Sequence, residues 1–226
     1  MNFFRGVSLR KFLRSRRVDG LDAFLREVQG VIHVGANEGQ ERFVYDRLGL
    51  RVLWIEPIDD VYARLLDNIR RFPRQAAVKA LVTDRDGVEY DFHISNNDGV
   101  SSSIMELKAH REIWPDVDYA NSVSMRSVTL PTLMVGENLD IADYQALVMD
   151  TQGSELLVLQ GAEPVVRQFE FIKVEVPDFE SYTGCCQVQD MDGFMATHGF
   201  SKYRQRSFAG KEGVGRYFDI VYRRQQ

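Results

Sequence analysis

Residues 31–41 read Val31-Ile32-His33-Val34-Gly35-Ala36-Asn37-Glu38-Gly39-Gln40-Glu41. An apolar run rich in β-branched residues stops at Gly35, a turn of small residues leads to Gly39, and a helical pattern follows. The stretch predicts a strand, a tight turn and a helix. Such a turn can cradle a nucleotide-type ligand, because glycines let it approach the main chain and a helix start offers unpaired N–H groups. The spacing matches neither the dinucleotide fingerprint nor a P-loop, so a turn that serves packing alone is the alternative.

Length, composition and charge set the broad class. The chain has 226 residues, of which 44% are hydrophobic and 27% charged, as expected for one globular α/β domain. Its formal net charge of -5 and pI near 5.5 lack the basic footprint of a nucleic-acid binder. We therefore expect no nucleic-acid partner.

The cysteines and the hydropathy pattern bear on the compartment. Cys185 and Cys186 are adjacent, which suits neither a disulfide framework nor zinc-ligand spacing. Nowhere does an apolar run reach the length of a membrane span, and the first residues lack the apolar segment of a secretory signal. We expect a cytoplasmic protein.

The first 20 residues differ from the acidic remainder. Basic and apolar side chains alternate there with almost no acid; the basic ones are Arg5, Arg10, Lys11, Arg14, Arg16 and Arg17. Such a segment can lie on an anionic membrane, dock a partner, cover the ligand pocket or act as a targeting segment, and it can equally be a solvated helix. We divide the chain into a basic helical extension, residues 1–29, and a main domain, residues 30–226.

A second buried strand, residues 51–57, ends in a carboxylate. Ligands of open parallel sheets bind beyond the carboxyl ends of the strands, where an acid after the second strand commonly accepts hydrogen bonds from ribose hydroxyls. Glu56 is therefore a candidate ribose ligand, and the alternative is a surface acid at a helix entry.

Further strands and helices alternate along the chain, which predicts a mainly parallel sheet closed by an antiparallel pair. Residues 95–127 are the least periodic, and we interpret them as a functional loop or lid, with a mobile surface loop as the alternative. The other expected elements are strands at 76–83, 128–133, 146–150, 171–176, 200–208 and 217–223, a hairpin through 88–94 added to the sheet, a helix after Ser154 broken near Gly161 and Pro164, and a helix at 188–198.

Several ordered motifs carry a family resemblance. They are His33-Val34-Gly35-Ala36-Asn37-Glu38-Gly39-Gln40, Glu56-Pro57, Asn68, Met149-Asp150-Thr151-Gln152-Gly153-Ser154-Glu155 and Val158-Leu159-Gln160-Gly161-Ala162-Glu163. Together they closely resemble the FkbM family of S-adenosylmethionine-dependent methyltransferases over residues 31 to about 200. The resemblance implies the class I methyltransferase fold, a Rossmann-like, doubly wound, mainly parallel seven-stranded sheet with an antiparallel closing strand, here with an extra hairpin.

The resemblance also implies a cofactor site. The turn with Gly35, Asn37 and Gly39 would hold the methionine end of S-adenosylmethionine, and Glu56 the ribose hydroxyls. Asp84, after the third strand, is a looser candidate for the adenine. His33 stands where the family more often has Asp, which would change how the amino group of the cofactor is held.

The implied chemistry is O-methylation of a hydroxyl, an in-line displacement that needs positioning and a base for the hydroxyl proton. Asp150 is our first candidate for the base. Its place resembles the magnesium site of some metal-assisted O-methyltransferases, and Glu175 at the next strand end would complete an oxygen-rich site for Mg2+. Alternatively, Asp150 caps a helix and Glu175 forms an ion pair. The histidines are further candidate bases, namely His33, His93, His110 and His198.

The resemblance suggests a sugar, glycan or natural-product hydroxyl as the acceptor. Trp114 and Tyr119 in the irregular segment could stack on a sugar ring, and a membrane-docked basic start would favour a lipid-linked glycan. Two other functions remain open at this point. One is a nicotinamide-dependent oxidoreductase, which shares the strand, glycine turn and strand-two acid, and the other is a non-catalytic nucleotide-binding scaffold.

Overall fold

The structure is a computed structural model that describes residues 20–225. The basic residues that precede Gly20, and with them the proposed membrane contact, lie outside the described residues. The division into residues 1–29 and 30–226 therefore stays a prediction. In the part of the chain that is described, no helix has the length and apolar character needed to cross a membrane.

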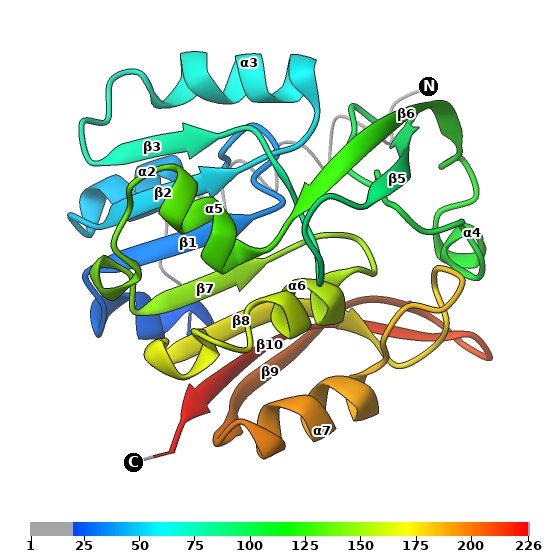
Figure 1. Cartoon of the computed structure of the whole chain (residues 1–226). Coiled ribbons are helices and arrows are strands. Elements are labelled where there is room, and N and C mark those ends of the chain that lie inside the picture. The colour runs from blue at the N-terminus through cyan, green and yellow to red at the C-terminus, as the bar shows by residue number, and fades with distance from the viewer. Residues whose placement is uncertain (1–19, 226) are drawn as a thin grey trace.

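A seven-stranded sheet forms the centre of the domain (Figure 1). Its strand order is β3-β2-β1-β7-β8-β10-β9, and β10 runs antiparallel to both of its neighbours, whereas β3, β2, β1, β7 and β8 pair in parallel. This confirms the predicted mainly parallel sheet with its antiparallel closing strand. The strands span Gly30–Val34 (β1), Arg51–Ile55 (β2), Gln75–Val78 (β3), Ala146–Met149 (β7), Phe171–Pro177 (β8), Phe200–Lys211 (β9) and Gly215–Arg224 (β10).

Helices cover both faces of the sheet, and each face has its own apolar core. Successive residues of a strand point to opposite faces, so Val31 joins one core and Ile32 the other. The 3-10 helix η1 (Asp22–Arg26) with α2 (Arg42–Arg47) and α3 (Asp59–Ile69) packs on the Val31 face; α5 (Leu130–Gly136), α6 (Glu155–Gly161) and α7 (Val188–Thr197) pack on the Ile32 face. The predicted break after α6 is confirmed, since a separate 3-10 helix, η3 (Val166–Gln168), follows it.

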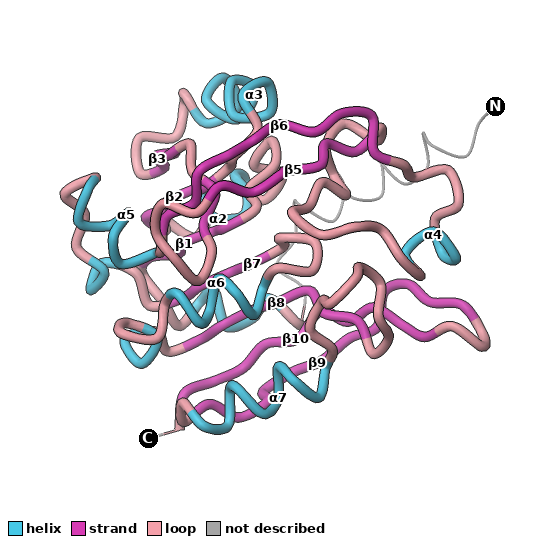
Figure 2. Tube along the Cα trace, turned by 45° about the vertical axis from the view of Figure 1, so that its right-hand side comes forward, coloured by secondary structure: helices cyan, strands magenta, loops and turns pink. Residues whose placement is uncertain are grey.

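A second, three-stranded sheet lies beside the main one (Figure 2). It consists of β4 (Leu81–Val82), β6 (Tyr119–Val128) and β5 (Glu89–Ser95), with β6 in the middle and antiparallel to β5. The strand expected at 76–83 is thus divided between two sheets. The hairpin expected through 88–94 corresponds to the antiparallel pair of β5 and β6, whose strands are joined by residues 96–118. This pair belongs to the second sheet and is not added to the main one.

The strand expected at 128–133 is wrong, because helix α5 begins at Leu130. The Thr129 hydroxyl caps it by accepting a hydrogen bond from the Thr132 N–H, and Pro131 lies in its first turn. A Thr cap followed by Pro is a helix-start signal that outweighs the β propensity of the preceding residues. The same stretch therefore ends one strand and starts a helix.

A mostly buried ion pair ties η1 to the sheet. Lys173 Nζ of β8 lies 2.6 Å from Asp22 Oδ1, and their side chains are only 19% and 26% exposed. Burial alone would lower the pKa of Lys173, but the carboxylates of Asp22 and Asp219 raise it above its ordinary value. The lysine is therefore charged inside the domain and depends on these acids.

Replacing Asp22 with Ala is expected to lower the free energy of unfolding by roughly 2–3 kcal/mol, because it leaves a poorly solvated ammonium group without its closest carboxylate. Urea denaturation at pH 7 measures this. The control is Asp143→Ala, which removes the exposed ion pair with Arg51 and should cost less than about 1 kcal/mol. Equal costs for the two variants would contradict the structural role of Asp22.

Candidate active site

The turn after β1 is shaped by contact with the end of β7. Gly35 has φ +76°, and a Cβ atom added to it would lie 2.0 Å from the carbonyl oxygen of Asp150. Both the backbone conformation and this contact exclude a larger residue. The glycine therefore brings the turn after β1 directly against the backbone of Asp150, so the segments that follow β1 and β7 meet at this edge of the sheet.

Gly39 has a related role further along the turn. Its φ is +68°, and an added Cβ would lie 2.8 Å from Leu65 Cδ1 of α3. This glycine thus lets the turn pack on the neighbouring helix. At both positions a contact within the protein requires glycine. The packing role that the sequence offered as an alternative is therefore present, and it does not exclude a role in ligand binding.

Glu56 holds the turn from the end of β2. Its Oε2 accepts a hydrogen bond from the Asn37 N–H at 2.9 Å, and its Oε1 accepts one from the Ile58 N–H at 3.0 Å. Burial raises the pKa of Glu56 to about 7, although both backbone hydrogen bonds oppose the shift. A carboxylate has about four acceptor positions, so hydroxyl groups can still bind here.

Asp150 and Glu175 are joined by the side chain of Gln152. Gln152 Nε2 lies 2.5 Å from Asp150 Oδ1 and 3.4 Å from Glu175 Oε1, while its Oε1 accepts a hydrogen bond of 2.8 Å from the Tyr182 hydroxyl. The structure therefore brings the two predicted carboxylates together around one amide group.

Glu155 fixes the loop that contains Gln152. Its buried carboxylate accepts hydrogen bonds from the Thr151 N–H at 2.8 Å and from the Gly153 N–H at 3.0 Å. Burial, together with the nearby Asp150, raises the pKa of Glu155 to about 7 against the effect of these hydrogen bonds. The loop after β7 is thus bound to the first turn of α6.

His33 lies in the interior beneath this edge. Its ring stacks on Trp54 at a centroid distance of 4.9 Å, and its Nδ1 is 3.1 Å from the Tyr45 hydroxyl. Burial lowers the pKa of His33 to about 4 despite the opposing effect of Asp150, so the ring is neutral near pH 7. Its predicted role at the amino group of the cofactor stays a prediction.

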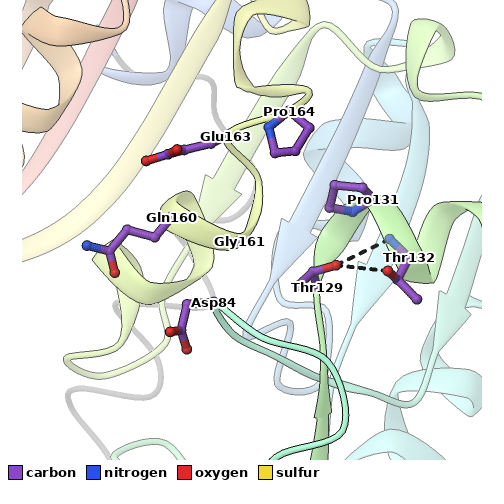
Figure 3. A pocket seen from close by; sticks show the side chains of 8 residues that line it. All are labelled: Asp84, Thr129, Pro131, Thr132, Gln160, Gly161, Glu163 and Pro164. Atoms are coloured by element: carbon purple, nitrogen blue, oxygen red, sulfur yellow. Dashed lines mark hydrogen bonds between the residues drawn. The ribbon is translucent and has the colours of Figure 1, made fainter.

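Asp84 lies in different surroundings from Glu56. Its carboxylate binds Arg85 Nε at 3.0 Å and the Tyr90 hydroxyl at 3.3 Å. It lines a cavity of about 670 Å³ between the ends of α5 and α6, opposite Thr129 and close to Gln160 (Figure 3). The described contacts therefore do not join Asp84 to the turn after β1, and its adenine role stays a prediction.

The irregular segment before β6 is anchored to the loop after β7. The Ser103 hydroxyl donates a hydrogen bond of 2.7 Å to the carbonyl of Gln152. Trp114 packs on His110 and Tyr217, and Tyr119 stacks on His93, so both aromatic rings predicted to meet a sugar have intramolecular ring partners. The segment is therefore one wall of the same region.

The other histidines have contacts elsewhere. His93 Nδ1 is 2.7 Å from Ser122 Oγ, His110 Nδ1 is 2.7 Å from the Tyr217 hydroxyl, and the His198 ring stacks on Phe194. Within residues 20–225 no group of three or more His, Cys, Asp or Glu side chains has the arrangement of a metal site. The magnesium site at Asp150 and Glu175 stays a prediction, with an amide group between its two ligands.

The comparison with protein families decides the class. The model of the methyltransferase FkbM domain matches residues 33–202, more than half of the chain. The chain belongs to the FkbM methyltransferase family. This confirms the resemblance drawn from the motifs and supports S-adenosylmethionine-dependent methyl transfer over a nicotinamide-dependent reaction. No curated protein matches the sequence.

Solved structures share the fold of this FkbM methyltransferase at low sequence identity. A candidate tRNA methyltransferase of Streptococcus pneumoniae, in complex with S-adenosylmethionine, is 11% identical with a TM-score of 0.51; the match covers 96% of this chain and 73% of that one. Fibrillarin of Aeropyrum pernix with natively bound S-adenosylmethionine is 11% identical with a TM-score of 0.50, over 95% and 74% of the chains. Both confirm the class I methyltransferase fold.

The exclusion of nucleic acid as a partner was wrong. The fold also occurs in the candidate tRNA methyltransferase, so a chain of this fold is compatible with a nucleic-acid acceptor. The physical error lies in using net charge, which is a sum over the whole surface and does not describe the local potential at a binding face. The acidic balance of this sequence therefore excludes no class of acceptor.

The residues present fit S-adenosylmethionine. Glu56 is a buried carboxylate with acceptor positions left for a ribose diol, and its place after β2 is the one that binds ribose in related sheets. The turn beside it is held in shape by the Asn68 side chain, which donates to the Glu38 carbonyl at 2.9 Å. The sequence analysis gave no site role to Gln152, Tyr182 or Glu155. Only Gln152 and Glu155 carried a signal, since both lie in the motif after Asp150.

His33 gives a testable pH dependence. Because its folded pKa is about 4, below the usual 6.5, its contribution to stability is complete above pH 6.5 and is lost as the pH falls toward 4. In His33→Gln this loss is absent, so the stability deficit of the variant at pH 7.5 should shrink by about 2 kcal/mol at pH 5. Urea unfolding at both pH values measures it.

Tyr45→Phe is the matched control, because it removes the hydroxyl next to His33 but leaves the imidazole in place. This variant should keep the pH dependence of the wild type. A deficit of His33→Gln that is the same at pH 5 and pH 7.5 would show that the histidine is not held neutral by burial.

Proposed function

We propose that this FkbM methyltransferase transfers the methyl group of S-adenosylmethionine to a hydroxyl group of a sugar, glycan or natural product. The observation that carries the proposal is the contact between Gly35 and the carbonyl oxygen of Asp150, which brings the backbone of this acidic residue against the turn predicted to hold the methionine end of the donor. A base at this point can reach an acceptor hydroxyl that approaches the methyl group.

The protein contributes binding, orientation and removal of one proton. When bound, S-adenosylmethionine supplies a methyl group on a positively charged sulfur, which leaves with the electron pair of the broken carbon–sulfur bond. Glu56 would hold the ribose hydroxyls of the donor, and the turn at Gly35 and Asn37 would orient its reacting end. Asp150 accepts the proton of the acceptor hydroxyl while the hydroxyl oxygen forms its bond to the methyl carbon, so charge and atoms balance.

Glu56→Ala is expected to weaken binding of S-adenosylmethionine and S-adenosylhomocysteine at least roughly 30-fold, because hydrogen bonds to a charged acceptor are worth about 1.5–3 kcal/mol. Titration calorimetry on the purified chain measures both ligands, with nicotinamide dinucleotides beside them. Glu212→Ala, an exposed acid in the turn between β9 and β10, is the matched control and should bind like the wild type. Binding of a nicotinamide dinucleotide instead would favour the oxidoreductase alternative.

Asp150→Asn is expected to lower kcat by roughly 10²–10⁴-fold with little change in donor affinity, because the amide cannot accept the hydroxyl proton. The measurement is methyl transfer to a panel of hydroxyl acceptors, followed through S-adenosylhomocysteine release, with and without Mg2+. Undiminished turnover in the variant would remove Asp150 as the base. Donor binding without turnover on any acceptor of the panel would favour the scaffold alternative.

A further inference from the structure

We propose that Gln152 is a positioning residue whose amide group clamps Asp150 and Glu175 together, with Tyr182 fixing the orientation of the amide. The geometry points to one donor shared by two carboxylates: Gln152 Nε2 lies 2.5 Å from Asp150 Oδ1 and 3.4 Å from Glu175 Oε1. The consequence for catalysis, a base held in place beside the glycine turn, rests on the function proposed above. The clamp itself does not.

The orientation of the amide follows from its three partners. A carboxylate oxygen only accepts hydrogen bonds, so the NH2 group must face Asp150 and Glu175. The carbonyl end then faces the Tyr182 hydroxyl, which donates to it at 2.8 Å. Turning the amide over would place its oxygen against two carboxylates. Tyr182 thus adds a reason for the NH2 group to stay between the acids.

The backbone of Gln152 is also constrained. Its φ is +54°, in the left-handed region that side-chain-bearing residues seldom adopt. Two contacts hold this conformation: Ser103 binds the Gln152 carbonyl, and Glu155 accepts the N–H groups of the residues on either side. A left-handed glutamine held on both sides directs its side chain back across Asp150 toward β8.

Further ionisable groups surround the two acids. Electrostatic interactions link Asp150 with one group in β1, one directly after β2 and one in α6, and link Glu175 with two tyrosines. These groups are His33, Glu56, Glu155, Tyr182 and Tyr217. Two of the five are acids and one is a neutral histidine, so the surroundings add negative charge. The amide hydrogens of Gln152 offset part of the resulting repulsion.

Loss of the shared donor has a predictable sign. Without it two charged carboxylates face each other with no shared donor, so the ionised pair is less favourable in the folded protein than in the wild type. Relative to the wild type, the variant therefore loses stability as the pH rises and recovers it at low pH, where a protonated carboxyl can donate to its neighbour. A role in shape alone would give the same deficit at every pH.

The test uses Gln152→Met, which keeps the length of the side chain and removes both donors. Thermal unfolding of the full chain without ligands is followed at pH 4.5 and pH 8. We expect the Tm of the variant to lie about 4 °C below that of the wild type at pH 8 and less than half as far below it at pH 4.5. An equal deficit at the two pH values would overturn the clamp.

Two further variants separate the donor from the shape. Gln152→Lys restores a group that donates to both acids, and it should abolish the extra loss at pH 8. Gln160→Met makes the same change at an exposed glutamine of α6 and should show no pH-dependent deficit. If Lys fails to rescue, or if Gln160→Met behaves like Gln152→Met, the proposal is wrong.

These measurements need neither donor nor acceptor, so they are independent of the proposed activity. A pH-dependent deficit without methyl transfer would leave the clamp intact and reject the O-methyltransferase function. Methyl transfer by the wild type without a pH-dependent deficit in Gln152→Met would support the function and reject the clamp.

Discussion

The close contact between Gly35 and the carbonyl of Asp150 is the constraint on which the site depends. Parallel strands β1 and β7 are paired in register through Val34 and Met149, so the segments that leave them must pass each other at the sheet edge. Only a residue without Cβ, with positive φ, leaves room for the Asp150 backbone. This contact sets the distance between the turn that faces Glu56 and the loop that presents Asp150.

Buried acids are the second feature of this edge, and they are costly. Burial raises the pKa of Glu56 and of Glu155 to about 7. Each of these acids therefore lowers the stability of the folded protein as the pH rises from about 4.5 to 7, because the buried carboxyl must then become charged. His33 and His110, with pKa values lowered to about 4, change stability in the opposite direction over much of this range. These opposing effects partly cancel in the pH dependence of the stability of the whole protein. Single variants are therefore needed to measure the contribution of each group.

The local parts of the fold could be predicted from the sequence, and the distant contacts could not. The strand at 31–34, the glycine turn and Glu56 are encoded by short-range patterns of hydrophobicity and turn residues. β6 was missed because most of its side chains are exposed and polar, which leaves no alternation to detect. Tyr182 is 30 positions from Gln152, and no local pattern indicates that its hydroxyl meets that amide.

The surroundings of Asp84 and of Gln152 have one physical explanation. A side chain takes its role from its neighbours in space, so Asp84, which follows a strand as Glu56 does, lies among other partners because β4 leaves the main sheet for the second one. Gln152 shows the converse. Its motif was visible in the sequence, but its function depends on a left-handed backbone that Ser103 and Glu155 hold from outside. Buried acids that destabilise the fold in this way are typical of functional sites, and their negative charge complements the positive charge of a sulfonium donor.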